Sequence, residues 1–240
     1  MSKQYETGHS KNVANFQKLI EQIAVYTKYN PPIESLKLEN LNILYNSGLT
    51  VLKELEEKRN ANKIAIHQRQ EAYENLKPIS SQIISHLDIL NPNEGTFEQA
   101  KSLKRLIQGS STKTKKVEEN KEDEETKTTS TSRQSYTELA ENFSKLLQVL
   151  ATVENYHPNT EALKLENLTS YHVNLVSTTQ AVNQTEAIFK TKLIERNNLL
   201  YADNTGLYDI AQDVKKYVKS VYGNSAKEYT NISKIKFTNK

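Results

Sequence analysis

Few side chains of this 240-residue chain stand at spacings that suit metal binding. The clearest case is Glu154-x-x-His157, the spacing with which helical bundles hold carboxylate-bridged metals. The matching positions in a repeat described below are Thr27 and Asn30, so the second half of such a ligand set is missing. Pro158 follows the histidine directly and places it at a helix end. The pattern favours a surface histidine, and the sequence predicts no metal and no cofactor.

Paired carboxylates for acid–base catalysis are the second candidate chemistry. Four glutamates recur at matched positions, namely Glu34, Glu39, Glu161 and Glu166. They stand at predicted helix starts and on exposed flanks, where a negative charge favours the helix dipole. The chain has no cysteine, which excludes thiolate nucleophiles, thiolate metal sites and disulfides. It also has no phosphate-binding glycine loop and no Gly-x-Ser-x-Gly motif. We therefore expect no catalytic residue and no enzyme.

Lysines and tyrosines alternate near the C-terminus, in a composition that suits a phosphate backbone with stacked bases. The central lysines of this stretch are Lys215, Lys216 and Lys219. The same residues fit a solvated basic face, because tyrosines at helical spacing line a half-buried stripe. The 32 basic and 29 acidic residues leave a net charge of only +3, which makes no case for nucleic acid. Binding of nucleic acid or an anionic surface remains the alternative to a protein partner.

The chain is organised around a segment that occurs twice. Residues 29–41 read YNPPIESLKLENL, and residues 156–168 read YHPNTEALKLENL. The offset of 127 residues between Tyr29 and Tyr156 also aligns Asn15 with Asn142 and continues without a gap to Ile83 and Ile210. The match predicts a tandem duplication.

Each copy of this segment predicts a corner between two helices. Proline lacks an N–H and disfavours a helical residue before it, so the first helix ends there. A glutamate then favours the start of the next helix, and the tyrosine ring packs across the corner. The corner residues are Tyr29, Pro31 and Glu34 in the first copy and Tyr156, Pro158 and Glu161 in the second.

Polar positions with no evident architectural need are the candidate interaction residues. In the corner segments these are Lys37, Glu39, Asn40, Lys164, Glu166 and Asn167. The long helices add Arg69 and Arg196, which the heptad spacing places on a polar seam.

The apolar periodicity predicts an all-α fold, and only 6 glycines and 5 prolines leave few turns for a sheet. Each copy is predicted to be a four-helix unit, with two long and two shorter helices. The two units are expected to form an elongated, pseudo-twofold helical bundle with coiled-coil character. The predicted parts are a disordered N-terminus (1–10), repeat 1 (11–109), a disordered mixed-charge linker (110–135) and repeat 2 (136–240). A break or frayed packing is expected near Gly48 in the long helix of the first copy.

The chain also resembles an uncharacterised family of two-repeat helical bacterial proteins. The resemblance rests on residues 12–16, the doubled Tyr-x-Pro corner, Arg196-Asn197 with Leu200-Tyr201, and the run from Asn204 to Lys219. It covers almost the whole chain apart from the linker. It implies the two-repeat helical plan and carries over no activity, ligand or catalytic residue.

No window approaches the roughly 18 to 20 apolar residues that span a bilayer, so we expect no membrane segment. Residues 1–8 are polar, and no apolar stretch of a secretion signal follows them, which favours the cytoplasm. The sequence thus predicts a non-enzymatic helical scaffold or protein-interaction module, and nothing in it indicates a particular oligomeric state.

Overall fold

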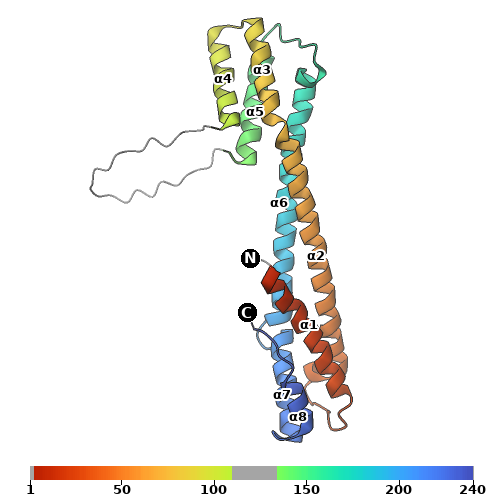
Figure 1. The fold of residues 1–240 in the computed structure, drawn as a ribbon. Coiled ribbons are helices and arrows are strands. Elements are labelled where there is room, and N and C mark those ends of the chain that lie inside the picture. The colour runs from red at the N-terminus through yellow and green to blue at the C-terminus, as the bar shows by residue number, and fades with distance from the viewer. Residues whose placement is uncertain (1–2, 110–133, 240) are drawn as a thin grey trace, which may run out of the picture. The chain divides into compact units, whose positions relative to one another are not determined.

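The computed structural model describes residues 3–109 and 134–239, and the side chains of all of these except 3–7. Over these residues the chain forms helices and no strand, so the predicted all-α class is confirmed for the part described (Figure 1). Most of the predicted linker, residues 110–133, lies outside the described residues.

Eight α-helices and two short 3-10 helices make up the described chain (Figure 1). In order they are α1 (Lys3–Ala24), η1 (Glu34–Leu36), α2 (Leu38–Glu74), α3 (Leu76–Leu90), α4 (Glu94–Gln108), α5 (Tyr136–Ala151), η2 (Glu161–Leu163), α6 (Leu165–Tyr201), α7 (Leu207–Tyr222) and α8 (Lys227–Ser233).

The N-terminal helix differs from the sequence prediction, which placed residues 1–10 in a disordered segment. Helix α1 begins at Lys3. His9 within it is only 3% exposed, and its Nδ1 lies 2.7 Å from the hydroxyl oxygen of Tyr201. This long-range hydrogen bond anchors the first turns of a segment whose own composition is too polar to predict a helix.

The predicted break near Gly48 is also absent, since α2 runs unbroken from Leu38 to Glu74. A Cβ atom at Gly48 would lie 3.2 Å and 3.4 Å from the two γ-methyl carbons of Val13, and 3.7 Å from Cδ1 of Leu207. The glycine thus lets α1 approach α2 closely, and this packing offsets the weak helix propensity of glycine.

The described chain divides into two compact units, and neither coincides with one copy of the sequence repeat. Unit 1 comprises residues 1–62 and 185–240, and unit 2 comprises residues 63–184. Each unit therefore takes helices from both halves of the sequence. Helices α2 and α6 each contribute residues to both units.

The core of unit 1 is built from α1, the first part of α2, the last part of α6, and α7 and α8. Its fully buried residues include Phe16, Leu19 and Ile23 from α1, together with Val214 and Val218 from α7. Helix α1 contacts α7, and the corner helix η1 also contacts α7. Helix α1, at the start of the sequence, thus packs against α7, which lies near its end.

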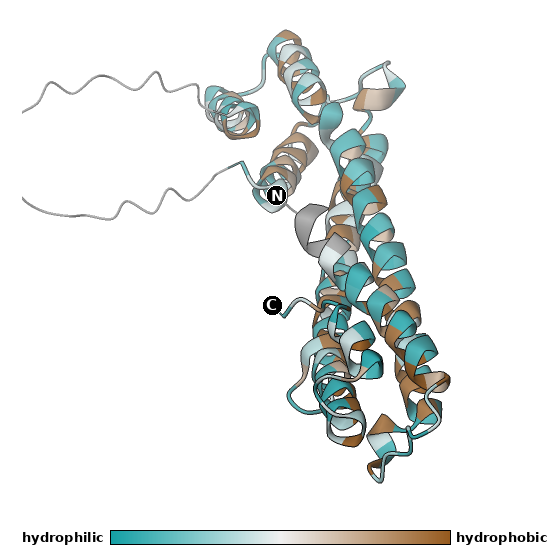
Figure 2. Ribbon diagram, turned by 60° about the horizontal axis from the view of Figure 1, so that its bottom comes forward, coloured by the Kyte–Doolittle hydropathy of each residue, from teal (hydrophilic) through white to brown (hydrophobic). Residues whose placement is uncertain are grey.

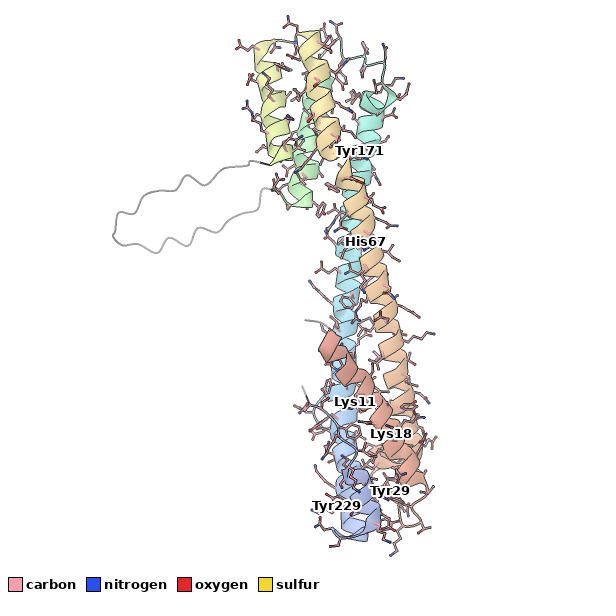
Figure 3. All side chains as sticks on the ribbon, viewed as in Figure 1. Lys11, Lys18, Tyr29, His67, Tyr171 and Tyr229 are labelled. Atoms are coloured by element: carbon pink, nitrogen blue, oxygen red, sulfur yellow. The ribbon has the colours of Figure 1, made fainter. Side chains whose placement is uncertain are left out.

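The core of unit 2 joins α3 and α4 to α5 and the first part of α6. Helix α5 packs against α4, and η2 packs against α3. In Figure 2, α5 is drawn mostly in brown, in agreement with the buried Phe143, Leu146 and Leu150. Tyr171, labelled in Figure 3, donates a 2.7 Å hydrogen bond to the carbonyl oxygen of Ala72 and so joins α6 to α2.

The same type of hydrogen bond closes both corners. The Tyr29 hydroxyl donates to the carbonyl oxygen of Leu36 at 2.7 Å, and the Tyr156 hydroxyl donates to that of Leu163 at 2.9 Å. Tyr29 is labelled at its corner in Figure 3. Burial raises the pKa of Tyr156 to about 12, so its hydroxyl keeps its proton well into the alkaline range. The tyrosine therefore closes each corner by both packing and a hydrogen bond.

Removing the corner hydroxyl tests how much this bond contributes. We expect Tyr156→Phe to lower the free energy of unfolding by about 1–3 kcal/mol, because it leaves a buried carbonyl without its partner. Tyr29→Phe is the matched control with a smaller expected loss, because the Tyr29 bond is partly exposed and water can replace the hydroxyl. Urea unfolding of both variants measures the difference, and a larger loss in Tyr29→Phe would contradict this account.

Candidate functional site

Four of the six polar positions in the corner segments brace the corners themselves. The ammonium groups of Lys37 and Lys164 form ion pairs with the glutamates three residues earlier. The side-chain amides of Asn40 and Asn167 each donate a 2.7 Å hydrogen bond to the carbonyl oxygen of Glu34 or Glu161. These bonds hold the 3-10 turn against the start of the following long helix. The structure thus supplies the local role that the sequence did not reveal.

The other two positions, Glu39 and Glu166, lie exposed in the first turns of α2 and α6. There their charges complement the helix dipoles. Pro31 and Pro158 are buried at the corners that they form.

The C-terminal lysines do not form one open basic face. Lys215 turns inward, where its ammonium donates to the carbonyl oxygen of Ile235 and lies 5.0 Å from the ring centre of Phe237. Burial, and next the charge of Lys236, lower the pKa of Lys215. Lys216 pairs with Asp213 at 2.8 Å. Lys219 is exposed and lies 5.7 Å from the ring centre of Tyr229.

The end of the chain is bound along α1. The side-chain amide of Asn12 donates to the carbonyl oxygen of Thr238 at 2.8 Å and accepts from the Thr238 backbone N–H at 3.0 Å. Asn15 donates to the carbonyl oxygen of Lys236 at 2.7 Å. Asn12 also donates to the hydroxyl of Tyr201 at 3.2 Å, which links the tail to the contact between His9 and Tyr201. These bonds position the N-terminal side of the pocket described next.

An arginine pocket of about 210 Å³ lies in unit 1. Its lining residues, which define the arginine pocket, are His9, Ser10, Leu52, Leu55, Glu56, Arg59 and Arg196. Helix α1 supplies the first two, α2 the next four, and α6 the last. The sequence predicted Arg196 as an interaction residue but did not single out its neighbours.

Arg196 is the most buried cation of the pocket, with 6% of its surface exposed. Its Nε and Nη2 both donate to the side-chain oxygen of Asn197, at 3.2 Å and 2.8 Å. Among the residues described, no carboxylate lies within ion-pair distance of it. Burial is the main cause that lowers its pKa, and the charge of Arg59 acts in the same direction.

Arg69, the matching residue 127 positions earlier, has different surroundings. Its guanidinium carbon lies 4.0 Å from the ring centre of Tyr136, and its buried Nε has no hydrogen-bond partner. Tyr136 stands where the other copy has His9. An aromatic ring thus covers Arg69 in unit 2, whereas Arg196 lines a pocket in unit 1.

A second hollow, the α2/α6 groove, has a volume of about 530 Å³. Its lining residues, which define the groove, are Ile43, Asn46, Ser47, Thr50, Val51, Glu54, Glu195 and Leu199. Ile43 is 58% exposed. The hydroxyls of Ser47 and Thr50 each donate a 2.9 Å hydrogen bond to the carbonyl four residues earlier in α2. Ser47 and Thr50 therefore line the groove with hydroxyl donors that are already engaged within α2.

Acidic groups lie at one end of this groove. The ammonium of Lys192 donates to Glu54 at 2.9 Å and to Glu195 at 2.6 Å. Two carboxylates share this one cation, so their formal charges leave the end of the groove with a net charge of about −1.

Comparison of the whole chain with protein-family models, curated proteins and solved structures finds no match.

Metal binding and membrane spanning are two further properties on which the sequence made predictions. Within the described residues, no group of three or more histidines, cysteines, aspartates and glutamates is placed to hold a metal ion. His157 and Glu154 are both exposed. No helix in the described part of the chain has the length and apolar character that crossing a membrane requires.

The sequence missed His9 and the α2 residues of both hollows. His9 falls in a segment predicted to be disordered, and Ile43 reads as one of many apolar positions on a long helix. One signal was present, because the aligned copies differ at His9 and Tyr136 and again at Ile43 and Ser170. Positions where two similar segments differ in chemistry are candidates for a role found in one copy only.

Proposed function

We propose that this chain is a non-enzymatic helical scaffold that binds an amphipathic helix of another protein in the α2/α6 groove. The observation that carries the proposal is an open groove of about 530 Å³ whose lining includes the exposed Ile43 together with Val51 and Leu199. Helices of partner proteins dock in such grooves through apolar residues spaced three and four apart.

The charge at the end of the groove specifies the partner further. Glu54 and Glu195 share Lys192, which leaves a net negative charge beside the apolar lining residues Ile43, Val51 and Leu199. A partner helix with an apolar stripe and a lysine or arginine near one end is complementary to this arrangement. The proposal includes the cytoplasmic location expected from the sequence.

The proposal also includes the tandem duplication, with its two halves related by a pseudo-twofold axis. It is supported by matched contacts, because η1 packs on α7 while η2 packs on α3. The tyrosine hydrogen bonds of the two corners support it as well. In a scaffold of this kind, each compact unit needs helices from both halves.

Nucleic-acid binding through the C-terminal helices is the weaker alternative. Lys215 is engaged with the backbone of Ile235, and Lys216 is paired with Asp213. Two of the three predicted lysines thus already have partners within the chain, which weakens the case for a phosphate-binding surface.

Variants of the groove test the proposal. We expect Ile43→Glu to abolish capture of the partner from native cell extract, because it places a charge in the apolar groove. Ile89→Glu is the matched control, since Ile89 is 81% exposed on α3 in unit 2 and should leave capture unchanged. A photo-crosslinking residue at Thr50, read by mass spectrometry, should label an amphipathic helix with a basic end.

Two results would overturn the proposal. One is equal capture by the original chain and by both isoleucine variants. The other is loss of all partners on nuclease treatment, which would favour the nucleic-acid alternative.

A further inference from the structure

We infer that the arginine pocket of unit 1 binds the carboxylate group of a small acid with a short aliphatic body. This site is separate from the α2/α6 groove, with which it shares no lining residue. The inference therefore does not depend on the proposed protein partner.

The charge of Arg196 is the first support. A buried cation is costly unless an anion compensates it, and the Nε and Nη2 atoms of Arg196 donate to the neutral amide of Asn197. Arg196 is more than nine-tenths buried and lines the pocket. A carboxylate in the pocket would give the planar guanidinium the partner that suits its geometry.

The net charge of the pocket is the second support, because it selects the charge of the ligand. Arg59 donates to Glu56 at 2.8 Å, so these two formal charges largely balance. Arg196 then leaves the lining with a net charge of about +1 when His9 is neutral. A monoanion balances this charge of about +1. A phosphate dianion would exceed it, and its excess negative charge would be repelled by the Glu56 carboxylate.

The walls and the volume of the pocket determine the chemical character and the size of the rest of the bound acid. Leu52 and Leu55 line it beside the charged groups. They offer an apolar surface for a short alkyl chain. At about 210 Å³ the pocket is below the roughly 300–1,000 Å³ of sites for drug-sized ligands, so the acid must be small.

The aligned residues in unit 2 explain why unit 1 alone would bind. There Tyr136 covers the guanidinium of Arg69 at 4.0 Å. Glu186 stands in the sequence where the other copy has Arg59. The cation is thus retained in both copies, but the covering ring occupies the face that a ligand would need.

Titration of the full chain with 3-methylbutanoate, followed by calorimetry and by NMR of the arginine Nε–H signals, tests the inference. We expect one binding site per chain, in the millimolar range typical of so small a ligand, and a shift of the Arg196 signal. The uncharged analogue 3-methylbutanamide should not bind measurably. Inorganic phosphate should bind more weakly than 3-methylbutanoate.

Matched arginine variants locate the site. Arg196→Gln should weaken binding by at least about tenfold, because it removes a charge-assisted contact. Arg69→Gln should leave binding unchanged. Arg196→Lys keeps the charge but loses the planar fork, so an intermediate loss is expected. Circular dichroism checks folding, and if Arg196→Gln does not fold, Arg59→Gln takes its place with an expected several-fold loss.

Three outcomes would overturn the inference. The first is binding that is equal in the Arg196 and Arg69 variants. The second is binding of the amide as tight as that of the acid, and the third is tighter binding of phosphate. None of these bears on capture by the groove, so the two proposals fail independently.

Discussion

Cutting the chain within residues 110–133 should give two fragments, 1–109 and 134–240, that fold only together. We expect each fragment alone to lose most of its helicity and equimolar mixing to restore it. The reason is that neither compact unit can be completed from one fragment. Circular dichroism and size-exclusion chromatography of the separate and mixed fragments measure the effect.

The hydrophobic core of unit 1 shows how strongly separation should destabilise the fragments. In unit 1, fragment 1–109 supplies Phe16, Leu19 and Ile23, whereas fragment 134–240 supplies Val214 and Val218. Separation would expose these side chains, at roughly 1.5–3 kcal/mol for each large one. For these five side chains the loss is about 7.5–15 kcal/mol, which is as large as the roughly 5–15 kcal/mol by which a whole domain is stabilised.

A suitable control is the intact chain with a protease site in the same segment, cut after folding. This cut protein should stay associated and helical until denaturant is added. A fragment that folds as a homodimer would agree with the two-unit structure. The second molecule can supply helices similar to those of the missing fragment, because the two halves of the sequence are similar. A cooperatively folded monomer of residues 1–109 would contradict the two-unit structure.

Replacing Gly48 by leucine should destabilise unit 1, because it places a large side chain where α1 and α2 approach closely. A Cβ at this position would lie 3.2 Å from a methyl carbon of Val13, so a leucine side chain would push α1 away from α2. Overpacking of this kind costs about 1–3 kcal/mol, and more where a backbone must move. Urea unfolding of Gly48→Leu measures the loss.

A compensating set of substitutions is available in the chain itself. The residues aligned with Val13, Gly48 and Leu207 are Ala140, Leu175 and Ser80, and all three are buried. The large side chain thus stands on the long helix in unit 2, as Leu175, and on the neighbouring helices in unit 1, as Val13 and Leu207. We expect Val13→Ala and Leu207→Ser together to recover part of the stability lost in Gly48→Leu.

The recovery is measured as a coupling free energy in a mutant cycle. Leu49→Ala is a matched control, because Leu49 is exposed on the same helix and should show no coupling to Val13. Additive effects at Val13 and Gly48 would show that the two positions do not share one packing layer.

The corners show how far local chemistry can be predicted. Proline ends a helix wherever it stands, and a tyrosine two residues earlier reaches across the turn. The sequence therefore predicted the packing of Tyr29 and Tyr156, and the structure adds the hydrogen bonds to Leu36 and Leu163. It did not predict the bonds of Asn40 and Asn167, because side-chain amides suit solvent equally well.

The sequence by itself determined the helical class, the repeated corners and the apolar face of each helix, since these depend on residues at most a few positions apart. The tertiary structure alone decided which faces meet. Helices α1 and α5 carry similar apolar faces, so periodicity cannot say which half of the chain covers them. The structure places α1 against α7 and α5 against α4, and so brings His9 and Arg59 to one pocket with Arg196. That pocket depends on contacts between residues more than 100 positions apart, which no local pattern records.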